Sequence, residues 1–217
     1  MISPATWPWA ALAVLGGVHG LNPGMGWLFA VALGMQEKNR RAVWGALLPL
    51  AAGHALAIAT AIAVAGAVGL VVPTGSIRWI VAATLLVLGV VRLRRHRHPR
   101  WVGMRVGARD LTLWSFLMAS AHGAGLMALP FVLAATDPAV AEHHHVHGAA
   151  MSSLPPGAMT GLLATAAHTV GYLVVLALMA ALVYERLGLR LLRTAWVNLD
   201  LIWAGALTCT AVLTVLV

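Results

Sequence analysis

Charged side chains are scarce in this chain of 217 residues, because Asp, Glu, Lys and Arg together make up only 9% of it. Only six residues are acidic, so we do not expect the carboxylate-rich di-iron centre that some helix bundles hold. A single cysteine, Cys209, excludes a disulfide scaffold and a cysteine-rich metal cluster. A His-Glu-x-x-His motif and a recognisable Ser/His/Asp arrangement are also lacking, so an enzyme is the less favoured interpretation.

The chain is rich in apolar residues: 61% are hydrophobic, and the mean hydropathy is +0.88. A helix needs about 20 apolar residues to cross a bilayer, and six such runs can be drawn. The predicted spans are Trp9–Met35, Val43–Val71, Ile77–Val91, Leu111–Ala135, Thr160–Tyr184 and Leu199–Val217. We therefore predict an all-α integral membrane protein of six transmembrane helices in a lipid bilayer. Met1–Pro8 carries no Lys or Arg, so we expect no cleaved signal peptide.

Basic residues occur almost entirely in three of the predicted loops, those after spans one, three and five. They are Lys38, Arg40, Arg41, Arg92, Arg94, Arg95, Arg97, Arg100, Arg105, Arg109, Arg186, Arg190 and Arg193. Lys and Arg mark cytoplasmic loops, so the loop Thr136–Ala158, which has neither, is predicted to lie outside. Both termini then lie outside the cytoplasm of a multi-pass inner-membrane protein. Topology explains the net charge of +8, and no nucleic-acid partner is predicted.

Under this topology the chain divides into two three-helix units, 1–110 and 111–217, that cross the membrane in opposite directions. The first unit includes the long basic loop, and the second includes the outer loop, which is rich in histidine. SIRWIVAATLLVLG in the third span aligns with NLDLIWAGALTCTA in the sixth. Inverted repeats of this 3+3 kind are typical of secondary transporters, whose site lies near the midplane between the repeats.

Four histidines lie inside apolar stretches and form two matched pairs, His19 with His54 and His122 with His168. Ionisable groups in a membrane span are costly and mark sites or pathways, so we predict that the four share one centre. The alternative is four histidines that each pack helices through hydrogen bonds. No two of them are three or four residues apart, so a shared site must be assembled across helices.

Imidazole chemistry allows two uses of such a centre. Neutral histidine binds transition-metal ions, and histidine also carries protons near physiological pH. Met25 and Met127 are candidate additional ligands, because thioethers favour soft ions such as Cu(I). Methionine at helical spacing is more often packing than ligand. A transition-metal ion of unassigned identity is the predicted ligand.

The strongest local signal is the interruption His19–Gly26 in the first span. Pro23 lacks an N–H and the glycines lower helix propensity, which frees backbone groups that protein, water or ligand must satisfy. We predict that Asn22 and these backbone groups help to bind substrate, and that Pro23 and Gly24 form a hinge. The alternative is a kink that only shapes the helix. The stretch His122–Met127, with Pro130 beyond it, repeats the pattern less sharply.

A histidine tract lies in the predicted outer loop, with His143, His144, His145 and His147 following Glu142. Short histidine-rich tracts bind divalent transition metals. We predict an outer relay that collects or releases ions at the mouth of a pathway. A flexible polar loop without a specific ligand is the alternative.

The stretch NPGMGWLFAVALGMQEKNRRAVWGALLPLAAGHALA resembles the opening of the LysE superfamily of small membrane transporters. The positions that match in kind are Pro23, Gly24, Arg40, Arg41, Gly45, Gly53 and His54. That superfamily includes nickel/cobalt permeases and cadmium-resistance proteins, so the resemblance implies a transport role near these branches. The His and Asp-His element of the nickel/cobalt permeases and the paired cysteines of the disulfide-reductase relatives are absent. The resemblance therefore assigns no substrate.

We predict a transporter that moves a transition-metal cation through the central histidines. One alternative is an exporter of an amino acid or other small organic solute, in which the histidines couple protons. Another is an integral membrane metalloenzyme or metal-binding protein that holds a metal without moving it. The sequence is compatible with a homo-oligomer, whose size it does not specify.

The topology can be tested with single cysteines introduced into a Cys209→Ser background. Because the loop Thr136–Ala158 is predicted outside, a membrane-impermeant thiol reagent should label it in intact cells. Cysteines placed between Arg94 and Arg105 should be labelled only after the cells are opened. Protection of the histidine-rich loop in intact cells would contradict both the orientation and the inverted repeat.

Overall fold

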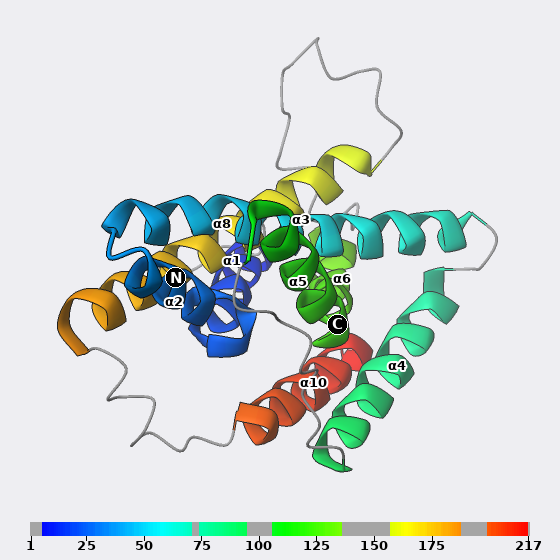
Figure 1. Ribbon diagram of the computed structural model, residues 1–217. Helices are drawn as coiled ribbons and strands as arrows, with labels where there is room; N and C mark the ends of the chain where they lie inside the picture. Colours follow the sequence, from blue (N-terminus) through cyan, green and yellow to red (C-terminus); the bar gives the residue numbers. More distant parts are fainter. Residues whose placement is uncertain (1–5, 71–73, 95–105, 136–156, 188–198, 217) are drawn as a thin grey trace, which may run out of the picture.

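The computed structural model describes residues 6–70, 74–94, 106–135, 157–187 and 199–216, and every regular element in these ranges is helical (Figure 1). The elements are α1 (Trp7–Leu21), the 3₁₀ turn η1 (Pro23–Met25), α2 (Trp27–Gln36), α3 (Arg40–Gly69), α4 (Thr74–Arg94), α5 (Ala108–Ala121), α6 (Ala124–Ala135), α8 (Ala158–Leu182), the π turn η3 (Val183–Leu187) and α10 (Leu199–Leu216). The prediction of an all-α chain is confirmed.

Two described helices are long and apolar enough to cross a membrane, α3 and the continuous stretch Ala158–Arg186. The pair α5 and α6, bent by 65° at its break, gives a third if it counts as one span. The apolar parts of the other helices are shorter, at Trp27–Gln36, Ser76–Val91 and Ala204–Leu216. The helices are compatible with lipid contact, and the count of six spans stays a prediction.

The interruption predicted in the first span is present, and its turn chemistry is visible. α1 ends at Leu21, and Asn22 leaves the helix in an extended conformation. The Asn22 side-chain oxygen accepts a hydrogen bond of 2.9 Å from the Gly24 N–H, so it caps η1. Gly26 has φ +137°, a region that favours glycine, and α2 starts at the next residue. Asn22 and Gly26 therefore fix the break between α1 and α2.

A second interruption separates α5 from α6 at the corresponding place in the second half. His122 ends α5, and Gly123 has φ +72° before α6 begins at Ala124. In each predicted unit, the first helix is therefore broken within one turn after a histidine.

The helices pack across the two halves of the chain. α1 lies along α8, α3 lies along α5, and α4 lies along α10 (Figure 1). A side chain at Gly16 would collide with the backbone of His168 and Tyr172, and one at Gly171 would collide with the backbone of Ala13. Small residues thus allow α1 and α8 to touch through their backbones, as in many membrane helix pairs.

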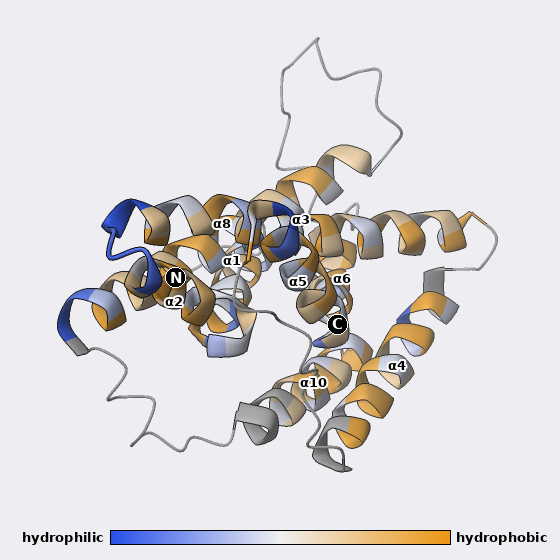
Figure 2. Cartoon of the chain, viewed as in Figure 1, coloured by the Kyte–Doolittle hydropathy of each residue, from blue (hydrophilic) through white to orange (hydrophobic). Residues whose placement is uncertain are grey.

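Polar residues gather at the connection of α2 to α3, at the start of α5 and at the end of α8, while the rest of the helices are mostly apolar (Figure 2). Arg40 and Glu185 join the first and last of these places through an ion pair of 2.7 Å. Arg40 also lies over the ring of Trp44, 5.8 Å from its centroid. Two connections predicted to be cytoplasmic therefore meet at one end of the molecule.

Two glycines of α3 provide a matched test of this packing. An alanine methyl group at Gly53 would meet the Thr112 carbonyl of α5, whereas one at Gly45 would meet nothing within 4 Å. We expect Gly53→Ala to destabilise the protein by about 1–3 kcal/mol through overpacking. Gly45→Ala should be neutral or stabilise by up to about 1 kcal/mol, because alanine favours the helix. Unfolding in detergent measures both, and equal effects would contradict the close contact of α3 with α5.

Candidate functional site

Three of the four predicted histidines come together in the interior. His19 lies in the last turn of α1, His54 in the middle of α3 and His168 in α8, and each is 0% exposed. The ring centroids are 5.6 Å apart for His19 and His54, 5.1 Å for His19 and His168, and 5.4 Å for His54 and His168. The structure thus brings histidines from both halves of the chain together at one place, here called the histidine cluster.

The packing of the helices explains this convergence. Gly16 brings α1 against the His168 backbone, which places His19, one turn later, beside the His168 ring. Gly53 brings α3 against α5, and α3 also packs on α8. The Nδ1 of His19 lies 2.8 Å from the Leu15 carbonyl oxygen, which fixes the orientation of that ring. The cluster therefore sits where α1, α3 and α8 meet.

Two rings of the cluster have nitrogens with no hydrogen-bond partner among the described residues. These are both nitrogens of His54 and both nitrogens of His168. Buried polar atoms in native proteins are nearly always paired, and leaving one unpaired costs about 1–3 kcal/mol. Four such atoms on two adjacent rings therefore indicate a place for a ligand, an ion or water.

Tyr172 belongs to the site although the sequence analysis did not select it. Its ring stacks on His54 with centroids 3.9 Å apart and planes 5° apart. Its hydroxyl donates a hydrogen bond of 2.6 Å to the Met25 carbonyl, in the break after α1. A signal for it existed: Tyr172 follows His168 by four residues, so the two share a face of α8, and the chain has only two tyrosines.

Aromatic side chains satisfy the backbone carbonyls that the break leaves free. Trp27 Nε1–H donates to the Leu21 carbonyl at 3.0 Å, and Trp114 Nε1–H lies 3.4 Å from the Gly24 carbonyl. Together with the bond from Tyr172, these contacts pair carbonyls that we expected to face substrate. Substrate binding by this backbone is therefore less favoured than binding by the histidines.

His122 lies at the break between α5 and α6 and is 3% exposed. Its Nδ1 is 2.8 Å from the Met118 carbonyl oxygen, four residues earlier, the same bond that His19 makes with Leu15. It is close enough to His19 to interact with it electrostatically. Ring contacts join His19, His54 and His168, and His122 interacts with this cluster through His19.

The other predicted site residues are placed differently. Asn22 is 5% exposed, and its side-chain oxygen is occupied by the Gly24 N–H. Met25 is buried in the apolar cluster that contains Tyr172. Met127 packs in another cluster, with residues of α4 and α10. Pro23 and Gly24 lie in η1 at the break, and their role as a hinge stays a prediction. The predicted outer relay of His143, His144, His145 and His147 lies outside the described residues.

The spacing of the three rings resembles that of a tri-histidine metal site. Imidazole nitrogens about 2.0–2.1 Å from a tetrahedral ion place the ring centroids roughly 5 Å apart. The orientations differ from those of bound ligands, since His54 and His168 are stacked with planes 17° apart. Among the described residues, no three or more His, Cys, Asp or Glu side chains are already arranged to hold a metal ion. Rotation of the rings would be needed.

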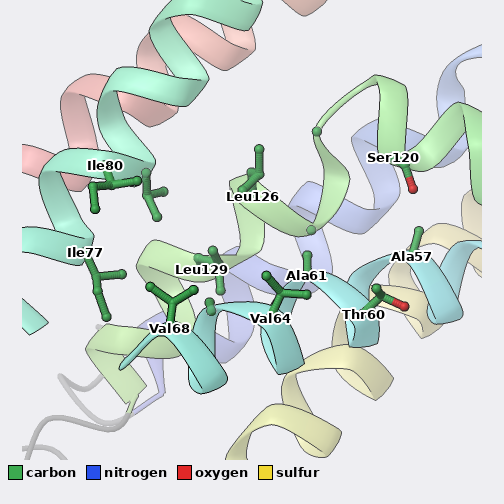
Figure 3. A pocket seen from close by; sticks show the side chains of 14 residues that line it. Ala57, Thr60, Ala61, Val64, Val68, Ile77, Ile80, Ser120, Leu126 and Leu129 are labelled. Carbon is green, nitrogen blue, oxygen red and sulfur yellow. The ribbon is translucent and has the colours of Figure 1, made fainter. Parts of the chain in front are cut away.

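An apolar groove of about 310 Å³ lies on the described part of the protein (Figure 3). α3, α4 and α6 form its walls, and Figure 3 shows Val64, Ile77 and Leu126 among the side chains that line it. Ala57, one turn after His54, and Ser120, two residues before His122, are also part of its lining. Two lining residues are therefore near buried histidines in the sequence, while no histidine lines the groove itself.

Comparison with protein-family models, with curated proteins and with solved structures finds no match to this chain. The chemistry of the site is therefore argued from its own residues.

The role of Tyr172 can be tested by removing only its hydroxyl. Tyr172→Phe keeps the ring that stacks on His54 but leaves the buried Met25 carbonyl without its donor. We expect a loss of about 1–3 kcal/mol in stability, measured by thermal unfolding in detergent. Tyr184→Phe is the matched control, because the Tyr184 hydroxyl has no partner within the part of the chain that the structure describes. Equal stability of the two variants would contradict the structural role of the Tyr172 bond.

Proposed function

We propose that this protein is a membrane transporter that moves a transition-metal cation through the histidine cluster. The observation that carries the proposal is the meeting of three imidazoles from three helices, at spacings of 5.1–5.6 Å, in a fully buried place. The ring nitrogens of His54 and His168, which have no partner among the described residues, supply the donors. Neutral imidazole is a ligand that first-row transition metals accept readily.

Movement, as opposed to static binding, is supported by the breaks beside the cluster. His19 precedes one break and His122 ends α5 at the other. Interrupted helices can absorb the dihedral changes of a hinge. Tyr172 links the cluster to the first break, because its ring contacts His54 and its hydroxyl contacts Met25. A change in the His54 ring can therefore be transmitted to the break between α1 and α2.

The two sides of the cluster differ in access. α3 starts at the basic connection after α2, and the groove lies along the later half of α3. That half is predicted to face outside. At the opposite end, the Arg40–Glu185 ion pair joins α3 to the end of α8, and Gly34 packs between Val43 and Tyr184. A groove at the predicted outer end of α3 and an ion pair at its predicted cytoplasmic end support a carrier whose two sides differ.

The helix pairing supports an inverted repeat of two three-helix units within this proposal. The first helix of each unit packs on the second helix of the other, as α1 on α8 and α5 on α3, and the third helices α4 and α10 pack together. His19 and His122 make equivalent bonds at equivalent breaks. We include six spans, termini outside the cytoplasm and kinship with the LysE superfamily in the proposal.

Metal flux into proteoliposomes tests the function. We expect His54→Ala to lower both binding and flux, because it removes a ligand. Pro23→Ala should lower flux more than binding, because it restores an N–H and stiffens the hinge. Leu56→Ala, on the exposed side of the same helix at 53% exposure, is the control for His54→Ala and should leave both unchanged.

Two outcomes would contradict the proposal. Tight, stoichiometric metal without flux at any gradient would indicate a membrane metalloprotein. Purified protein that binds no metal but exports an amino acid or other small solute with protons would indicate that the histidines carry protons.

A further inference from the structure

We infer that Tyr172 is a positioning residue of the histidine cluster: its ring holds His54 in an orientation that cannot share an ion with His168, so a ligand binds only when this stack opens. The inference rests on the proposed function and adds the regulation of the same site. Three observations carry it: the planes of the rings, the anchoring of Tyr172 and the contact of that anchor with the first break.

His54 is stacked on two rings of α8 that are one turn apart. Its plane lies 5° from that of Tyr172, with centroids 3.9 Å apart, and 17° from that of His168, with centroids 5.4 Å apart. The lone pair of an imidazole nitrogen lies in the plane of its ring, so two stacked rings direct their lone pairs into separate planes. His54 and His168 therefore cannot both point at one ion as they stand, in agreement with the lack of a preformed metal site among the described residues.

Binding requires the His54 ring to turn, and Tyr172 blocks this turn. Ring centroids 3.9 Å apart correspond to van der Waals contact, so rotation would drive an edge of the imidazole into the face of the phenol. Stacking also stabilises an aromatic pair beyond the area that it buries. The first step of ligand binding is therefore separation of the two rings.

Tyr172 is held firmly and cannot move aside alone. Its side chain is 0% exposed, and its hydroxyl donates to the Met25 carbonyl at 2.6 Å. Its backbone packs closely on α1, because a Cβ added at Gly20 would collide with the Tyr172 carbonyl. Displacement of the ring must therefore carry the Met25 carbonyl with it or break the bond to it. Opening of the stack is in this way linked to the break between α1 and α2.

The stack gives Tyr172 an effect on affinity whose sign is known. The apparent affinity of a site is its intrinsic affinity reduced by the fraction of molecules in the binding-competent form. Removing the stack raises that fraction and tightens binding. Removing a residue that only supports the fold would weaken binding. The sign of the change therefore distinguishes positioning from support.

Zinc binding by the full chain in lipid nanodiscs tests this sign. Tyr172→Leu removes the stack, and we expect zinc to bind about two- to tenfold more tightly. Leu178→Ala, on the exposed side of α8 at 63% exposure, is the control and should not change the affinity. Unchanged or weaker binding by Tyr172→Leu would overturn the inference.

The link to the break is tested by the smaller change Tyr172→Phe. This variant keeps the stack and loses the bond to Met25, so its affinity should rise less than that of Tyr172→Leu. Zinc flux in proteoliposomes should nevertheless fall, because opening of the stack no longer moves the Met25 carbonyl. Flux equal to that of the unmodified protein would overturn the link.

Magnetic resonance of the unmodified protein decides the role of the stack even if Tyr172→Leu fails to fold. Protons above the face of an aromatic ring resonate upfield, so the His54 ring protons should be shifted upfield in metal-free, histidine-labelled protein. His54→Gln identifies these signals. Saturating zinc should remove the shift. An upfield shift that persists while the His54 ring nitrogens report bound zinc would overturn the inference.

The outcomes separate the two proposals. Zinc that binds with the stack intact would overturn the role of Tyr172 and leave the transporter standing. Zinc that binds and opens the stack but does not cross the membrane would overturn the transporter and leave the role of Tyr172 standing. If zinc does not bind, the same variants are titrated with cobalt, nickel and Cu(I), and failure of all four metals to bind would overturn both.

Discussion

The backbone contact between α1 and α8 sets the geometry of the histidine cluster. Gly16 and Gly171 remove the side chains that would keep the two helices apart. Because the two helices touch through their backbones, the His19 ring contacts the His168 ring, and the Tyr172 hydroxyl reaches the break after α1. Larger residues at these glycines would separate the first half of the chain from the second at the point where their histidines meet. Packing of small residues, more than any polar bond, therefore builds the site.

Around this contact, polar groups are used sparingly and at defined places. Tryptophan and tyrosine donors satisfy the carbonyls of the first break, and the Ser115 hydroxyl donates to the Leu50 carbonyl at 2.6 Å. Both ring nitrogens of His54 and of His168 have no such partner among the described residues, and neither does the hydroxyl of Thr169, the next residue after His168. This concentration of unpaired buried groups points to the functional part of the molecule.

Part of this arrangement could be predicted from the sequence. Apolar composition predicted the helices, and Pro23 with its glycines predicted the break, because proline and glycine act locally and in any context. The four histidines were identified because ionisable groups are rare in apolar runs.

The remaining features depend on how helices pack, which local patterns do not encode. The ring contacts of His168 with His19 and His54 depend on the packing of α8 against α1 and α3, which the sequence around His168 does not reveal. Met25 and Met127 likewise fall in separate apolar clusters. Tyr172 was missed although its place four residues after His168 put both on one face of α8, because its stacking on His54 of another helix is visible only in the packed structure.

Apart from the Arg40–Glu185 ion pair, three hydrogen bonds between the two halves run in one direction, and this has a consequence for how the sequence can change. Tyr172, Ser115 and Trp114 all belong to the second half and donate from side chains, while their acceptors in the first half are backbone carbonyls. A carbonyl is present whatever the residue, so substitutions at Met25, Leu50 or Gly24 change these bonds only through shape. Substitutions at the three donors remove them outright. Two halves that arose by duplication would therefore be under unequal constraint. Each copy could lose its resemblance to the other at different positions, while the hydrogen bonds between the halves persist.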